Sequence, residues 1–119
     1  MSASAGRDRR LEFAFLTDHL RKVCQERKLA VTEFGEEAAL DLERKLADID
    51  ACSDALEFRA LCHDDLVEVS EHRWQLGLEG GCCVEFVAGH AKPRRTETGA
   101  TDWGKVTRLR IEAVGRSND

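Results

Sequence analysis

A glycine-rich turn between two alternating segments constrains the fold of this chain more than any other feature. The turn is Glu79-Gly80-Gly81, and the segments 74–78 and 82–86 on either side of it place an apolar side chain at every second position. This combination is a strong signal for a β-hairpin. Side chains on a strand point alternately to its two faces, so one face of the hairpin faces a core. That face carries Trp74, Leu76, Leu78, Cys82, Val84 and Phe86.

The opposite face of the hairpin is polar. The same alternation places Arg73, Gln75, Cys83 and Glu85 together on it. Any chemistry on this sheet would use that second face. We expect Cys83 to be a half-buried thiol.

The remaining segments predict an α+β fold with an N-terminal strand, a helical hairpin and a mainly antiparallel sheet of three or four strands. Thr17 is the expected N-cap of the first helix, and Asp54 with Glu57 has capping-box spacing. In the last strand we expect Leu109, Ile111 and Ala113 to point inward and Arg108, Arg110 and Glu112 outward. The expected elements are strand 11–16, helices 17–28 and 32–50, a short helical turn 54–61, strand 66–69, the hairpin, and strand 106–114.

Length and composition fit one domain. The chain has 119 residues, of which 42% are hydrophobic, enough for a single core. We assign the domain to residues 11–116, with a mobile tail at 1–10 and a flexible end at 117–119. No run approaches the roughly 20 apolar residues that span a bilayer, and residues 1–10 lack the apolar core of a signal peptide. The prediction is a cytoplasmic protein with no membrane partner.

The charge is acidic overall and basic locally. The net charge is -5, which argues against a large electrostatic surface for nucleic acid. The segment from residue 92 to residue 116, however, contains seven basic residues and only three acidic ones. A small basic patch on an acidic body is therefore expected.

Two segments resemble the RelE superfamily of toxins, in the HigB-like "killer protein" branch of bacterial type II toxin-antitoxin systems. Leu61-Cys62-His63-Asp64-Asp65-Leu66 is similar to the family's Cys-His-Glu-Leu segment. Lys92-Pro93-Arg94, followed by Asp102-Trp103-Gly104-Lys105-Val106-Thr107, is similar to the branch's proline-to-Asp-Trp-Ser-Lys-Val-Thr pattern. The resemblance covers about residues 11–114.

The resemblance implies a function and partners. Active members cleave messenger RNA in the ribosome without a metal or cofactor, and a cognate helix-turn-helix antitoxin holds them inactive. The chain would be a monomer or part of a toxin-antitoxin complex. Metal-free RNA cleavage needs a base for the ribose 2′-hydroxyl, an acid for the leaving oxygen and cations for the phosphate. His63 would be the base, and Arg73 and Arg110 would supply the catalytic cations.

The sequence departs from the family pattern at several of these positions. Cys82-Cys83 stands where the family has an aromatic-arginine pair, and Ser117-Asn118-Asp119 replaces a Tyr-His ending. An alternative reading is therefore a catalytically inactive protein of the same fold that engages an antitoxin or another protein target. A thiol-dependent role for Cys82-Cys83 is a third, supported only by their adjacency.

Each candidate residue also has a plain structural interpretation. His63 is either the base or a structural histidine bonded to a neighbouring aspartate. Arg73 and Arg110 could instead pair with Glu85 or Glu112. The candidates for RNA or phosphate contact are Arg94, Arg95, Lys105 and Arg108, whose alternative is a solvated surface. The cysteines and histidines show no spacing typical of a metal site, so we predict none.

Overall fold

The structure is a computed structural model that describes residues 11–90 and 92–116. The predicted tail 1–10 and the end 117–119 lie outside these residues. In chain order the elements are β1 (Glu12–Phe15), α2 (Asp18–Gln25), α3 (Arg27–Phe34), α4 (Glu36–Asp50), α5 (Ala55–Leu61), β2 (Leu66–Ser70), β3 (Arg73–Leu78), β4 (Cys82–Ala88), the 3-10 turn η1 (Trp103–Lys105) and β5 (Arg108–Arg116).

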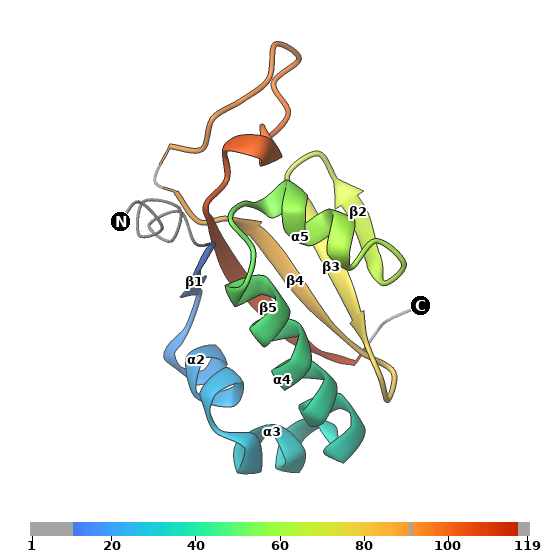
Figure 1. Ribbon diagram of the computed structural model, residues 1–119. Helices are drawn as coiled ribbons and strands as arrows, with labels where there is room; N and C mark the ends of the chain where they lie inside the picture. Colours follow the sequence, from blue (N-terminus) through green and yellow to red (C-terminus); the bar gives the residue numbers. More distant parts are fainter. Residues whose placement is uncertain (1–10, 91, 117–119) are drawn as a thin grey trace, which may run out of the picture.

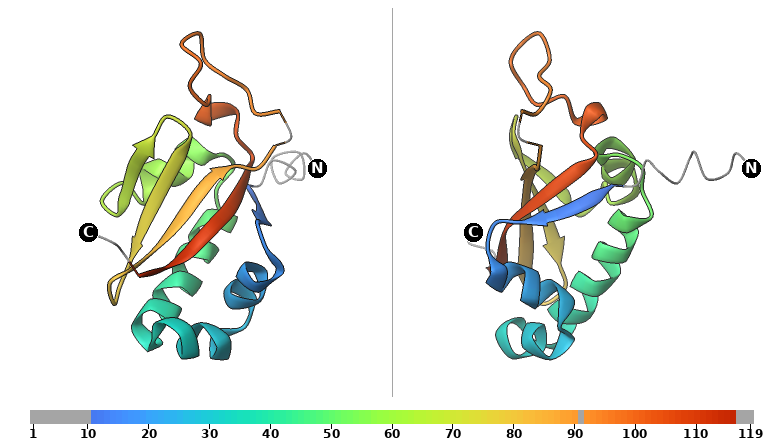
Figure 2. Two further views of the ribbon diagram at one scale, coloured as in Figure 1. Left: turned by 180° about the vertical axis from the view of Figure 1, so that it is seen from behind. Right: turned by 90° about the vertical axis from the view of Figure 1, so that its left-hand side faces the viewer.

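The five strands form one sheet in the order β1-β5-β4-β3-β2, with the helices on one of its faces (Figures 1 and 2). β1 is parallel to β5, and the other neighbours are antiparallel. This confirms the predicted α+β fold, and the N-terminal strand joins the sheet as its fifth member. Within residues 11–90 and 92–116 no α-helix covers the other face of the sheet, which we call the open face.

The hairpin forms as predicted. Gly80 and Gly81 have φ angles of 80° and 78°, a left-handed conformation that glycine adopts without steric cost. Trp74 pairs with Phe86 across the strands, and Leu76 pairs with Val84. All six residues predicted to face the core are buried. Cys83 lies on the open face but is also buried, at 7% exposure, between the paired glycines Gly77 and Gly115.

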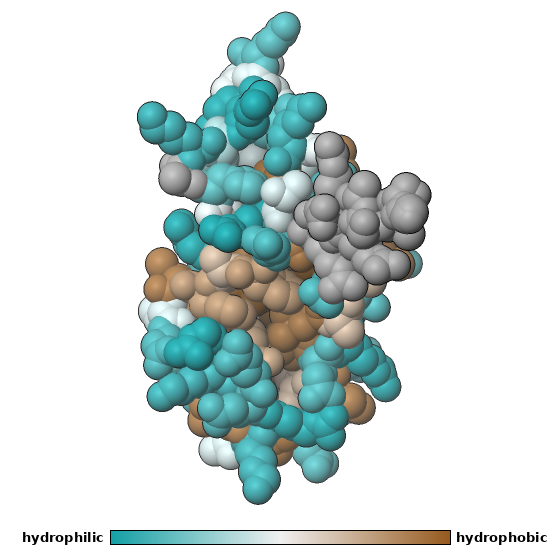
Figure 3. Space-filling view, turned by 60° about the vertical axis from the view of Figure 1, so that its left-hand side comes forward, coloured by the Kyte–Doolittle hydropathy of each residue, from teal (hydrophilic) through white to brown (hydrophobic). Residues whose placement is uncertain are grey.

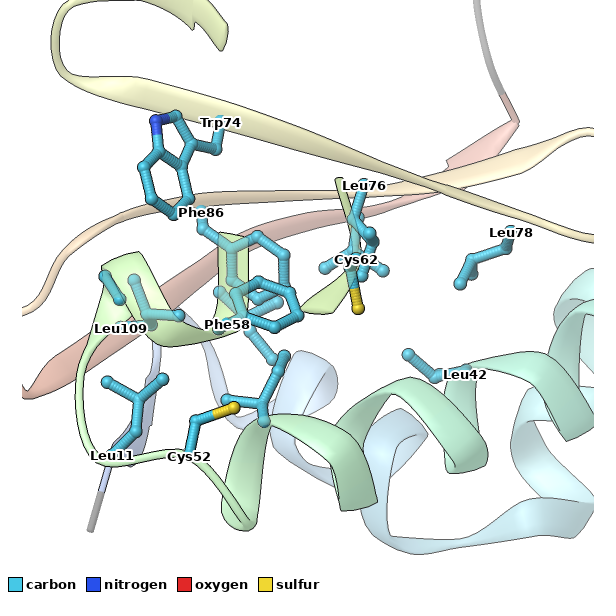
Figure 4. Packing of buried hydrophobic residues seen from close by; sticks show 14 of the residues in the cluster. Leu11, Leu42, Cys52, Phe58, Cys62, Trp74, Leu76, Leu78, Phe86 and Leu109 are labelled. Carbon is cyan, nitrogen blue, oxygen red and sulfur yellow. The ribbon is translucent and has the colours of Figure 1, made fainter. Parts of the chain in front are cut away.

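Aromatic contacts fix α5 and the long loop between β4 and β5 onto the sheet. Phe58 of α5 packs edge-on against Phe86, with ring centroids 5.9 Å apart (Figure 4). Trp103 of η1 stacks on Trp74 with centroids 4.0 Å apart, and its indole N–H donates to the Glu71 carbonyl at 3.3 Å. Such aromatic pairs contribute about 1 kcal/mol beyond their buried area. The loop is thereby anchored at one end of the sheet.

The helical segment differs from the prediction. Thr17 does cap α2, accepting a hydrogen bond from the Leu20 N–H at 3.1 Å, but α2 ends at Gln25 because Glu26 is extended. A separate helix, α3, follows, and Gly35 with a φ of 92° divides it from α4. The predicted bounds 17–28 and 32–50 were therefore wrong. The extended Glu26 ends the first helix early, and Gly35 ends α3 and starts α4.

The last strand also differs. It begins at Arg108 rather than Val106, and its pairing with β4 shifts so that Glu85 faces Ala113 while Phe86 faces Ile111. Glu112 is the extra residue of a β-bulge, which reverses the alternation beyond it. Ala113 is consequently exposed, against the prediction, and Val114 packs on the core instead.

The helices leave part of the inner face uncovered next to β1. Apolar side chains show at the surface there, in a hollow between polar surroundings (Figure 3). Among the helices of residues 11–90 and 92–116, none is both long enough and apolar enough to cross a membrane.

Candidate functional site

A cleft of about 340 Å³ lies on the open face, where β3 begins, β4 ends and the anchored loop leaves the sheet. Its floor comes from three neighbouring strands. Its wall comes from the loop. The charged or titratable side chains that line it are His72, Arg73, His90, Arg95, Arg110 and Glu112.

Strand alternation explains why these floor residues face the cleft. Trp74, Phe86 and Leu109 are fully buried on the helix side, so the positions next to them turn to the open face. Arg73 therefore faces outward from β3. Arg110 faces outward from β5, opposite Val87 of β4.

Two carboxylates hold the two floor arginines. Arg73 donates from Nη1 to Glu85 at 2.9 Å and from Nη2 to Glu112 at 3.0 Å. Arg110 donates from Nε to Glu112 at 2.7 Å. The predicted pairing with Glu85 or Glu112 is confirmed, and the guanidinium groups are fixed in place by it.

Glu112 is the centre of this network because it accepts from both arginines. Only 13% of its side chain is exposed. Burial alone would raise the pKa of this carboxyl, but the hydrogen bonds and charges of Arg110 and Arg73 outweigh it and lower the pKa below its ordinary value of 4.5. Glu112 is therefore a fixed anion that positions two cations.

His72 joins the sheet to the loop. Its Nδ1 lies 2.7 Å from the hydroxyl of Thr101, which is buried, and 2.7 Å from Nη1 of Arg95. A guanidinium can only donate, so Nδ1, the nearer ring nitrogen, accepts from Arg95, whose Nη1 also lies 3.2 Å from Nε2. Arg95 therefore lies against both ring nitrogens of His72, and this contact holds the loop at the start of β3.

His90 is fixed in a similar way. Its Nε2 accepts a hydrogen bond from the backbone N–H of Thr107 at 3.1 Å. The proton of the neutral ring is then on Nδ1. His90 therefore presents an N–H group, whereas the ring nitrogens of His72 lie against Arg95.

The cleft as a whole has the charge and the donors of an anion-binding site. Three arginines face one lining carboxylate, so the cleft is positive although the chain carries a net charge of -5. Guanidinium and imidazole N–H groups are the donors that bind phosphate oxygens. The arrangement suits a phosphate or phosphodiester.

The structure brings together three of the residues predicted from the sequence and separates the others. Arg73, Arg95 and Arg110 line the cleft. Arg108 pairs instead with Glu12 of β1 at 3.0 Å. Arg94 and Lys105 are exposed along the loop and do not line the cleft.

His63 lies apart from this cleft. It follows α5 in a turn where the Asp65 carbonyl accepts from Gly77 N–H, toward the end of β3, whereas the cleft is at its beginning. Its side chain is 80% exposed, and its Nδ1 is 3.1 Å from a carboxylate oxygen of Asp64. This contact matches the structural alternative for His63.

Sequence reasoning missed His72, His90 and Thr101 as members of this site. A signal for the histidines was present. His72 directly precedes the first hairpin strand, and His90 follows the end of the second strand after one intervening residue. Antiparallel strands place the start of one beside the end of the other. Nothing local pointed to Thr101.

Neither metal ligation nor thiol chemistry finds support in the described residues. Within 11–90 and 92–116, no three histidine, cysteine or acidic side chains are grouped so as to hold a metal ion. All five cysteines are free thiols, and burial raises the pKa of Cys24 and of Cys52 to about 11. Such thiols are poor nucleophiles at neutral pH.

No protein-family model, curated protein or solved structure matches this chain. The resemblance to the RelE superfamily therefore stays a prediction.

Proposed function

We propose that this protein is a RelE/HigB-like toxin, the partner of a helix-turn-helix antitoxin, and that it binds the phosphate backbone of RNA in the open-face cleft. The observation that carries the proposal is the convergence of Arg73, Arg95 and Arg110 in one cleft, beside the N–H group of His90. The choice of RNA as the ligand comes from the motif resemblance.

The geometry suits a single strand rather than a duplex. The cleft has room for a few atoms of backbone, and its donors come from both the floor and the loop. Exposed Arg94 and Lys105 extend the positive surface along that loop. Phosphate contacts of this kind give affinity without reading sequence. On the ribosome, the bound strand would be messenger RNA.

The resemblance implies that the protein cleaves RNA, but the contacts in the cleft do not favour cleavage. His63, the predicted base, lies outside the cleft, and each cleft histidine already has a ring nitrogen in contact with a donor, Arg95 for His72 and the Thr107 N–H for His90. These contacts favour the second candidate, a protein of this lineage that binds RNA or a protein target without cutting RNA.

The binding proposal is tested with a labelled short single-stranded RNA and two arginine variants of the same strand. We expect Arg110→Gln to weaken binding about fivefold to tenfold, since a charge-assisted hydrogen bond is lost. Arg108→Gln, outside the cleft, is the matched control and should change affinity less than twofold. Equal losses in both variants, or no binding by the wild type, would contradict the proposal.

Cleavage is tested separately by induced expression. A ribonuclease would arrest growth and cut translated messages, and His63→Ala or His72→Ala would show which histidine acts. Arrest with intact messages, or no arrest, would support the non-cleaving alternative. Relief of arrest by the product of an adjacent small helix-turn-helix gene would identify the antitoxin.

A further inference from the structure

A second recessed site lies on the helix side of the sheet, away from the RNA cleft. It is a groove of about 620 Å³ between β1, α2 and α4. Its apolar lining is Leu11, Phe13, Phe15, Cys24 and Leu46. Figure 3 shows an apolar hollow on this side of the molecule.

The groove runs beside a sheet edge whose strand has open hydrogen-bonding groups. The N–H groups of Glu12 and Leu16 donate to the β5 side, to Thr107 and Ile111. Since successive residues of a strand turn their backbone groups to opposite edges, those of Phe13 and Phe15 face away from β5. A segment paired with this edge would complete a sixth strand.

The same geometry would fill the groove. Phe13 pairs with Leu109 and Phe15 with Ile111, both buried under the helices, so the two phenyl rings also point to the helix side. Inward side chains of an added strand would lie beside these rings and against Leu46 of α4. One extended segment can therefore meet the backbone edge and the groove together.

The charge around the groove indicates the chemistry of that segment. The two carboxylates that line it are Glu12, which is paired with Arg108, and Asp50, and residues 12–50 hold ten acidic and six basic residues. A partner segment with basic side chains on its outward face is complementary to this half of the molecule.

We propose that the β1 edge and its groove bind an extended segment of another protein in which apolar residues alternate with basic ones. The proposal does not depend on the RNA cleft, which lies on the other face. It is independent of whether the protein is a toxin.

The probe is a synthetic peptide of alternating lysine and valine, followed by amide chemical shifts of the full chain. We expect saturable binding, with shifts centred on Phe13, Phe15 and Leu46. An alternating lysine-serine peptide carries the same charge and should bind at least tenfold more weakly, since it buries no apolar side chain. Equal binding of the two peptides would overturn the proposal.

Two leucine variants of α4 locate the site. Leu46→Ala should weaken the lysine-valine peptide about fivefold to tenfold, while Leu40→Ala, an exposed leucine outside the groove, should not. Equal effects of the two variants would overturn the proposal. A dimer joined through β1 in analytical ultracentrifugation would also overturn it, because the groove would then belong to a second copy. Binding that arises only after residues 2–10 are deleted would overturn it as well, because the groove would then belong to the chain itself.

Discussion

At the residue scale, Glu112 decides how the candidate site is arranged. Its carboxylate lies on the open face, as strand alternation predicts, and there it accepts from Arg73 and Arg110. The pKa of Glu112 is lower in the fold than its ordinary value, so its ionised form stabilises the native state. That contribution is fully present above about pH 4.5 and is lost as the pH falls through the lowered pKa.

Glu112→Gln should therefore reduce the free energy of unfolding by about 1 kcal/mol at neutral pH, because one of the two hydrogen bonds loses its acceptor and the other loses its charge. The difference from the wild type should shrink as the pH falls below about 4. Urea unfolding at a series of pH values measures both. Glu97→Gln, on the exposed loop, is the control. A deficit that stays constant down to pH 3 would show that Glu112 acts through packing and not through its charge.

At the element scale, α4 is tied to the hairpin by a buried carboxylate. Asp41 is 7% exposed and accepts from the backbone N–H of Glu79, in the hairpin turn, at 2.9 Å. Lys45, one helical turn along, lies 3.4 Å from Asp41 and 3.1 Å from Asp65. Burial alone would lower the pKa of Lys45, but these carboxylates raise it, so the ammonium stays charged at neutral pH.

Asp41→Ala removes the carboxylate that the Glu79 N–H and Lys45 share. It leaves the Glu79 N–H without its acceptor and Lys45 with one carboxylate, so we expect a loss of about 2 kcal/mol in the free energy of unfolding. Asp48→Ala on the same helix should lose less than about 0.5 kcal/mol. Hydrogen exchange at Glu79 should rise selectively in Asp41→Ala. Equal losses in the two variants would argue against a specific tether.

The elements that were predicted correctly are those with local causes. The hairpin follows from Gly80-Gly81 between alternating runs, and the caps at Thr17 and Asp54 follow from their own side chains. The bulge at Glu112 depends on how β5 pairs with β4, which no local pattern of β5 reveals. Alternation along each strand placed Arg73 and Arg110 on one face. Their proximity to His72 and His90 depends on the strand register, which the sequence pattern does not reveal.

At the scale of the whole molecule, charge is divided between two faces. The helical part is acidic, with ten acidic and six basic residues between positions 12 and 50, and the open face holds the positive cleft. A polyanion approaching this protein is repelled by one half of it. Binding of RNA should therefore depend on a few cations in one orientation, and not on a diffuse positive surface.

This separation predicts a shallow salt dependence. Three cleft arginines that neutralise about three phosphates would give a slope of about -2 in a plot of log affinity against log salt, at about -0.7 per contact with a single strand. Arg95→Gln should make the slope shallower by about 0.7, because its guanidinium would no longer displace a counterion. Arg108→Gln should leave the slope unchanged, since Arg108 is held by Glu12 outside the cleft. Fluorescence anisotropy with labelled single-stranded RNA at several salt concentrations measures all three slopes. A wild-type slope steeper than about -4 would mean that the loop cations, including Arg94 and Lys105, bind the strand together with the cleft, because three arginines cannot release that many counterions.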